Sequence, residues 1–282
     1  MNISSRLDAA PLHAATVVAC LQESSTLFTL QVRLDDAAAQ AAYRFAPGQF
    51  NMLQLDGVGE APVFVISDPE ERDLIGHTLR VLEHVTHGLA ALKPGDRVAL
   101  RGPFGRGWPL QEVGGCDVVI VTGGLDCVHM VSVIHYVLRR RERFGKLVVL
   151  QGVQQAEDLV WREQYDRWAT LPDTQVLVAA SEATASWPWH VGQATDLFGL
   201  ANFDPDCAVA MLCGPDDMMR NAADALLARG LPESRLYLGM ERHMQCVGDG
   251  ADPGQSGDAC VCRDGPVFNW RDARLLLAQR GG

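Results

Sequence analysis

The chain of 282 residues lacks several features that mark particular classes of protein. No stretch approaches the roughly 18 consecutive apolar residues that a membrane-spanning helix needs. The first 20 residues have no long apolar core behind a basic segment, so we expect no secretory signal peptide. Positive charge is scarce, because 24 Lys and Arg face 35 Asp and Glu, a formal net charge of −11. This balance argues against binding to nucleic acid or to an anionic membrane surface.

The cysteine pattern favours a reduced, cytoplasmic protein. Without an export signal, the eight cysteines are not expected to form a disulfide framework. Five are scattered along the chain, and we interpret them as small buried hydrophobic residues: Cys20, Cys116, Cys127, Cys207 and Cys213. The other three lie within Cys246–Cys262 and need a separate explanation. The length and an apolar content of 48% are sufficient for two domains with sizeable cores.

The region from residue 13 to about residue 105 alternates short apolar stretches with glycine and proline turns. Phe28, Leu30, Val32 and Leu34 alternate with polar neighbours, as in a half-buried strand. The pattern predicts strands at 28–34, 50–55, 63–67, 78–82 and 97–100, and one helix at 85–92. Many short strands with a single helix favour a small antiparallel β-barrel. We interpret the glycine-rich stretch 102–109 that follows as a linker between domains.

From residue 117 onward, predicted strands alternate with predicted helices. Asp117–Thr122 is a β-branched apolar run, typical of a strand buried on both faces, and Gly123 and Gly124 end it before a helix at 128–141. Further strands are predicted at 147–151, 175–179, 208–213 and 236–238, and helices at 157–168 and 216–228. This order predicts a doubly wound parallel sheet, which binds ligands at the carboxyl ends of its strands. Gly123-Gly124 and Cys213-Gly214-Pro215 are the two turns that qualify.

Seven motifs occur in one order along nearly the whole chain: PGQF (47–50), GEAP (59–62), VTHGLAAL with PGD (85–96), GPFGRGWP (102–109), VIVTGG (119–124), CGPDDMM (213–219) and ERHMQC…VCRDGPVF (241–268). Together they resemble the ferredoxin-reductase-like electron-transfer subunits of soluble nickel–iron hydrogenases and sulfhydrogenases, anaerobic sulfite reductase and dihydroorotate dehydrogenase. The resemblance implies an antiparallel FAD-type barrel (1–110), a doubly wound NAD(P)-type α/β domain (111–239) and a C-terminal cysteine loop with a [2Fe–2S] cluster (240–282). It also implies electron flow between NAD(P)H, FAD, the cluster and a partner subunit of a hydrogenase-like complex.

The same resemblance assigns candidate residues to the two organic cofactors. Those for FAD are Phe64, Val65, Ser67, Thr86 and Gly102, and those for NAD(P) are Gly123, Gly124, Asp126, Cys213, Gly214 and Pro215. Each of these sites departs from the family pattern. Phe64 stands where the family carries a hydroxyl-bearing residue, Glu83 replaces a glycine near the flavin pyrophosphate, and Asp126 replaces a glycine of the nicotinamide loop. Both acidic side chains repel a phosphate at these positions.

The cysteine loop leaves its metal chemistry open. The family's loop resembles C-x4-C-x2-C-x7-C, and Cys246 and Cys262 fit its first and last positions. The middle positions fall on Ala251 and Gly254, and Cys260 lies off the pattern. A [2Fe–2S] cluster normally takes four thiolates. Cys246, Cys260 and Cys262 with one further ligand, a zinc site that includes His243, and a metal-free loop are the three alternatives.

Two functions of different class follow from these observations. The first is an electron-transfer subunit that works with NAD(P)H, FAD and the cluster. The second is a cofactor-depleted relic of the same fold that serves as a docking subunit. A relay that keeps FAD or a metal without nicotinamide chemistry is intermediate between them.

Overall fold

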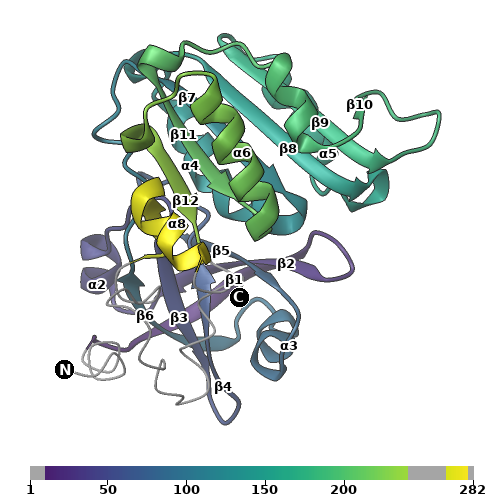
Figure 1. The fold of residues 1–282 in the computed structure, drawn as a ribbon. Coiled ribbons are helices and arrows are strands. Elements are labelled where there is room, and N and C mark those ends of the chain that lie inside the picture. Colours follow the sequence, from purple (N-terminus) through teal and green to yellow (C-terminus); the bar gives the residue numbers. More distant parts are fainter. Residues whose placement is uncertain (1–9, 241–264, 279–282) are drawn as a thin grey trace. The chain divides into compact units, whose positions relative to one another are not determined.

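A computed structural model describes residues 10–240 and 265–278, and these fall into two compact units (Figure 1). Residues 10–107 with 265–266 form the first unit, and residues 108–240 with 267–278 form the second. No helix in either described range is both long enough and apolar enough to cross a membrane.

The first unit is a six-stranded antiparallel barrel. Its strands are β1 (His13–Gln22), β2 (Leu27–Leu34), β3 (Phe50–Leu55), β4 (Gly59–Phe64), β5 (Ile75–Arg80) and β6 (Arg97–Phe104), in the order β4-β3-β6-β1-β2-β5. Beyond β4, the Ile66 N–H donates to the Gly76 carbonyl of β5 at 2.9 Å, which joins the two ends of the sheet. Among the described residues, this unit also contains helices α2 (Ala37–Ala42) and α3 (His84–Ala90). The barrel expected from the alternating pattern is confirmed.

Some predicted strand boundaries are wrong, and the reason is local. β4 covers 59–64 rather than 63–67, because an outer sheet strand accepts the proline of the GEAP motif. β6 runs to Phe104 and pairs there with Phe50, so the first part of the predicted linker 102–109 is strand. Gly102 permits this continuation, since its φ is +143° and a Cβ would lie 2.2 Å from the Asn51 side-chain oxygen.

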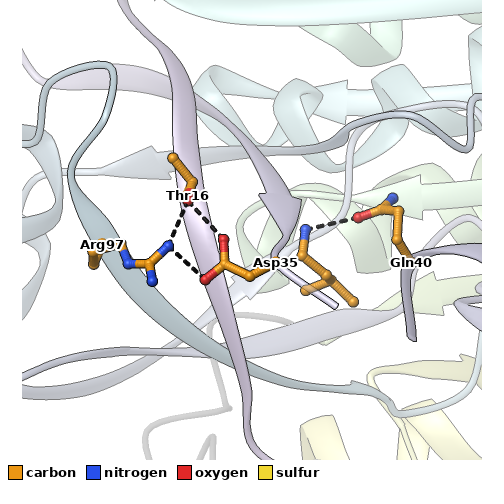
Figure 2. A network of polar contacts seen from close by, with 5 residues as sticks. Thr16, Asp35, Gln40 and Arg97 are labelled. Atoms are coloured by element: carbon orange, nitrogen blue, oxygen red, sulfur yellow. Dashed lines mark hydrogen bonds and ion pairs between the residues drawn. The ribbon is translucent and has the colours of Figure 1, made fainter. Parts of the chain in front are cut away.

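An exposed polar network links β1, β6 and the loop that follows β2 (Figure 2). The Arg97 guanidinium contacts Asp35 at 2.6 Å and donates to the Thr16 hydroxyl at 3.0 Å, and Thr16 donates to Asp35 at 2.7 Å. The Gln40 side-chain oxygen accepts the Leu34 N–H at 2.7 Å. Exposed ion pairs of this kind contribute about 0–1 kcal/mol, so the network fixes the β2–α2 connection more than it stabilises the fold.

The second unit is a seven-stranded sheet in the order β10-β9-β8-β7-β11-β12-β13. Its strands are β7 (Asp117–Gly123), β8 (Leu147–Gln155), β9 (Thr174–Glu182), β10 (His190–Val191), β11 (Ala208–Cys213), β12 (Leu236–Gly239) and β13 (Val267–Asn269). All neighbours are parallel except β12 and β13. Every residue of β7 and β11 is buried, as an apolar run between two helical layers requires.

In the described part of the chain, the α-helices that accompany this sheet are α4 (Cys127–Arg139), α5 (Arg162–Ala169), α6 (Asp216–Ala228) and α8 (Trp270–Ala278). α4 and α5 pack into one apolar core with β7 and β8. Because parallel crossovers are right-handed, α6 covers the opposite face, and Figure 1 shows it in front of the sheet. The predicted doubly wound sheet is confirmed, but the helix expected at 157–168 begins only at Arg162. Trp161 has a left-handed backbone with φ +56°, which excludes it from the helix.

A polar chain is buried inside the barrel. The Tyr43 hydroxyl donates to the Asn51 side-chain oxygen at 2.9 Å, and the Asn51 amide nitrogen lies 2.9 Å from His77 Nε2. Because Asn51 uses its oxygen for Tyr43, its amide donates to His77, which therefore carries its proton on Nδ1. His77 is fully buried, and burial lowers its pKa from 6.5 to about 3. The ring is thus neutral in the folded protein.

We expect this histidine to make the barrel sensitive to acid. In the unfolded chain His77 becomes protonated near pH 6.5, whereas in the folded chain it becomes protonated only near pH 3. The contribution of His77 to the free energy of unfolding is therefore complete above pH 6.5. Below pH 6.5 it decreases by up to about 1.4 kcal/mol per pH unit, because the unfolded chain binds the proton more readily. His77→Gln keeps an acceptor for Asn51 and should flatten this dependence in urea unfolding between pH 5 and 7. His87→Gln, at an exposed position, is the control, and an unchanged slope in His77→Gln contradicts the assignment.

Candidate functional site

The two glycine turns predicted as a nucleotide site lie together in the second unit. β7 and β11 are parallel neighbours, and Thr122 pairs with Cys213 at their carboxyl ends. The chain order of the sheet reverses between these two strands, which is where doubly wound folds bind their ligands. The turns pack directly, because a Cβ on Gly123 would lie 2.9 Å from Pro215 and 2.7 Å from Met218. A Cβ on Gly123 or Gly214 would therefore displace Met218.

Gly124 differs from these two glycines because it faces open space. Its φ is +58°, and no heavy atom lies within 4 Å of the position that a Cβ would take. The 3-10 turn Gly124–Asp126 then leads directly into α4. This space at a helix N-terminus is suited to an anion, but half-buried Asp126 brings a negative charge to the same turn.

A buried glutamine fixes the Gly123-Gly124 turn through hydrogen bonds. Gln151, the central residue of β8, donates from Nε2 to the carbonyl oxygens of Gly124 and Gly152, each at 3.0 Å. Its Oε1 accepts hydrogen bonds from the hydroxyls of Thr122 and, at 3.2 Å, of Tyr165. All four capacities of the amide are therefore used, and the turn is fixed. The sequence analysis missed Gln151, although a polar residue within LVVLQG was a readable signal.

Two buried cysteines lie at this end of the sheet. Burial raises the pKa of the Cys127 thiol to about 12, so this thiol stays protonated and unreactive. Cys213 is also buried, and its Sγ lies 3.7 Å from His129 Nδ1 on α4. His129 therefore reaches the carboxyl end of β11.

The residues predicted to contact FAD in the first unit have clear partners. Val65 lies in the barrel core, and the ring of buried Phe64 packs on Phe50 with centroids 6.1 Å apart. The Ser67 hydroxyl accepts the Gly76 N–H at 3.1 Å. The side chains of these residues thus serve the barrel itself, and the backbone of 64–67 is what remains for a ligand.

The start of α3 is closed by its own side chains. The Thr86 hydroxyl accepts the N–H groups of Leu82 and Glu83, at 3.1 and 3.0 Å, and donates to the Glu83 carbonyl at 2.9 Å. Glu83 itself is the N-cap residue of this seven-residue helix. The arrangement does not favour a pyrophosphate at this helix, because Thr86 occupies the Leu82 and Glu83 N–H groups and Glu83 adds a like charge.

Comparisons with known proteins identify the family. Residues 120–224 match the model of the oxidoreductase NAD-binding domain. The chain is 30% identical over 269 residues to the sulfhydrogenase 1 gamma subunit of Pyrococcus furiosus, covering 93% of this chain and 91% of the relative. The chain belongs to the family of sulfhydrogenase gamma subunits. The resemblance inferred from the motif order is thereby confirmed.

Other relatives of this gamma-type subunit agree. It is 27% identical to the "Probable dihydroorotate dehydrogenase B (NAD(+)), electron transfer subunit" of Methanocella arvoryzae, over 95% of this chain and 93% of that protein. A ferredoxin NADP+ reductase from Neisseria gonorrhoeae, solved with bound FAD and NADP, superposes with a TM-score of 0.62 at 20% identity. That match covers 78% of this chain and 92% of the reductase. The ferredoxin-reductase-like fold is therefore established.

The predicted metal ligands of the gamma-type subunit are not among the residues that the structure describes. Cys246, Cys260 and Cys262 lie within 241–264, so a cluster or zinc site there stays a prediction. Within 10–240 and 265–278, no group of three or more His, Cys, Asp or Glu residues is placed to hold a metal ion.

The packing of the turns predicts a specific coupling. In Gly214→Ala the new Cβ would lie 2.5 Å from Met218 Cε and 3.1 Å from its Sδ, which should cost about 1–2 kcal/mol of stability. Met218→Ala should relieve most of that cost, giving a measurable coupling energy in a double-mutant cycle by urea unfolding. Gly199→Ala, with no heavy atom within 4 Å of its Cβ, is the matched control. An equal cost in both Met218 backgrounds would exclude this contact.

Proposed function

We propose that this chain is the electron-transfer subunit of a multi-subunit redox complex of the hydrogenase kind. In this role it passes electrons between NAD(P)H, FAD and a [2Fe–2S]-type site in the cysteine loop, and on to a partner subunit. Family membership supports the role, since the relatives are sulfhydrogenase gamma subunits and dihydroorotate dehydrogenase electron-transfer subunits. The observation that carries it in this chain is the fixed, open glycine turn at the reversal point of the sheet.

Particular residues of the second unit would hold the nicotinamide nucleotide. The turn Gly123-Gly124 offers backbone amides and open space for phosphate, and Gln151 keeps that backbone in place. Cys213 and His129 lie at the end of the neighbouring strand. A nicotinamide supplies a hydride, which a flavin accepts and returns as single electrons. The protein's part is to hold the turn rigid before the nucleotide arrives, which lowers the entropy cost of binding.

Asp126 is the residue whose change should reveal this site. Its carboxylate stands where the family has a glycine, and repulsion of a phosphate costs about 1 kcal/mol or more at short range. Asp126→Gly should therefore tighten NAD(P)H binding at least about five-fold by fluorescence titration. Asp126→Asn, which removes the charge but keeps the side chain, separates repulsion from steric exclusion. Absence of saturable binding in all three forms contradicts a nucleotide site.

A specific observation also favours the second function, a docking subunit that has lost cofactors. The closed start of α3, with Thr86 and Glu83, does not fit a flavin pyrophosphate. Phe64, packed on Phe50, takes the place of a hydroxyl-bearing residue. These features lie in the first unit, whereas the turn at Gly124 lies in the second. Flavin could therefore be lost independently of the nucleotide.

The content of cofactors in the purified complex distinguishes the two functions. We expect anaerobically isolated complex to show flavin absorption, acid-released FAD and two irons per copy of this chain. Cys246→Ser should abolish the iron-dependent absorption, whereas Cys20→Ser, in the barrel, should leave it unchanged. A flavin-free, iron-free chain that still co-purifies with its partners would support the docking subunit instead.

A further inference from the structure

Two free cysteines lie side by side at the amino-terminal ends of the central parallel strands, opposite to the glycine turns. Cys116 immediately precedes β7, and Cys207 ends the 3-10 turn Pro205–Cys207 that immediately precedes β11. Because Asp117 pairs with Ala208 in parallel register, the residues before them also lie side by side. A six-residue strand places this pair about 20 Å from the carboxyl edge, so it belongs to a different part of the unit.

The two sulfur atoms are within reach of a covalent bond. The Cys207 thiol donates to Cys116 Sγ at 3.4 Å. A disulfide needs Cα atoms about 4.4–6.8 Å apart, and neighbouring strands lie about 4.8 Å apart. The remaining gap to a bonded S–S distance is about 1.4 Å.

The backbone on both sides of the pair is held by one carboxylate. Asp117 accepts the Lys146 N–H at 2.6 Å and the Asp204 N–H at 2.9 Å, which ties the turn carrying Cys207 to the strand that follows Cys116. The Cys207 N–H also donates to the Asp204 carbonyl at 3.0 Å. The two thiols are therefore brought together by a fixed frame.

Exposure gives the two thiols different roles. Cys116 is buried, and burial together with the adjacent Cys207 and the Asp117 carboxylate raises its pKa, against an opposing effect of Arg235. Cys207 is half-buried and so accessible to small molecules. The Arg235 guanidinium donates to the Asp206 carbonyl at 2.8 Å, which fixes the turn beside Cys207. Cys207 is thus the attacking thiol and Cys116 the resolving one.

We propose that Cys116 and Cys207 form a reversible intrachain disulfide when the protein meets a hydroperoxide. The Cys207 thiolate attacks the peroxide, the O–O bond breaks, and Cys207 becomes a sulfenic acid as the first water leaves. The Cys116 thiol then attacks the Cys207 sulfur, the S–S bond forms, and a second water leaves. Two thiols are oxidised and one hydrogen peroxide is reduced to two waters, and a dithiol reductant reverses the change by exchange.

The disulfide would join the segments before β7 and β11, which are 91 residues apart in sequence. It would restrict the unfolded chain and hold the two central strands in register at their amino-terminal ends. An oxidised subunit would therefore keep its α/β unit folded under the conditions in which hydroperoxides attack its other thiols.

The test is peptide mapping of the folded full-length chain after treatment with hydrogen peroxide. We expect one peptide pair linked through Cys116 and Cys207, recovered as free thiols after dithiothreitol, and an unfolding temperature raised by about 5 °C or more. Cys116→Ser should leave Cys207 as a sulfenic acid that a dimedone probe labels, and Cys207→Ser should leave Cys116 unmodified. Cys20→Ser is the matched control and should retain the link.

Two results would overturn the proposal. One is over-oxidation of Cys207 to sulfinic acid in the wild-type chain while Cys116 stays a free thiol. The other is a Cys116–Cys207 link that is no more abundant in the folded chain than in chain oxidised in urea, where pairing is statistical. Both comparisons use the wild-type chain, so they hold even if a serine variant fails to fold.

Discussion

The parallel pairing of β7 with β11 is the contact on which the second unit depends. These strands are adjacent in the sheet, but β8, β9 and β10 lie between them in the sequence. Their register, Asp117 with Ala208 through Thr122 with Cys213, decides what meets at each end of the sheet. At the carboxyl end it joins two glycine turns, and at the amino end it joins two thiols. The pairing of β7 with β11 thus creates both the candidate nucleotide site and the cysteine pair of this unit.

Around that pairing, buried polar groups act as fixing points for the loops. Gln151 uses its whole amide to hold the Gly124 carbonyl and two hydroxyls, and Asp117 holds backbone amides from two separate loops. Each group is buried, so breaking a bond leaves an unpaired polar atom at a cost of about 1–3 kcal/mol. Loops that must present a backbone to a ligand are therefore held by side chains within the sheet.

The two units differ in how well they keep the features of their family. In the second unit the turn at Gly124 is open, and its neighbouring glycines are fixed by close packing with Met218. In the first unit, the helix start at Thr86 is closed and Phe64 is part of an aromatic pair. The acidic residues Glu83 and Asp126 occupy equivalent places, each directly before a helix. Repulsion of phosphate is the physical property that these two positions share.

The sequence alone determined the fold class, the family and the position of both glycine turns, because periodic burial and glycines directly after apolar strands leave local signatures in the chain. The strand 208–213 and helix 216–228 were predicted with their observed bounds. Only the tertiary structure decided the role of Gln151, the use of the Thr86 hydroxyl by its own helix, and the 3.4 Å approach of Cys116 to Cys207. These contacts depend on strand register and side-chain direction across long sequence separations, and no local pattern of residues encodes such distances.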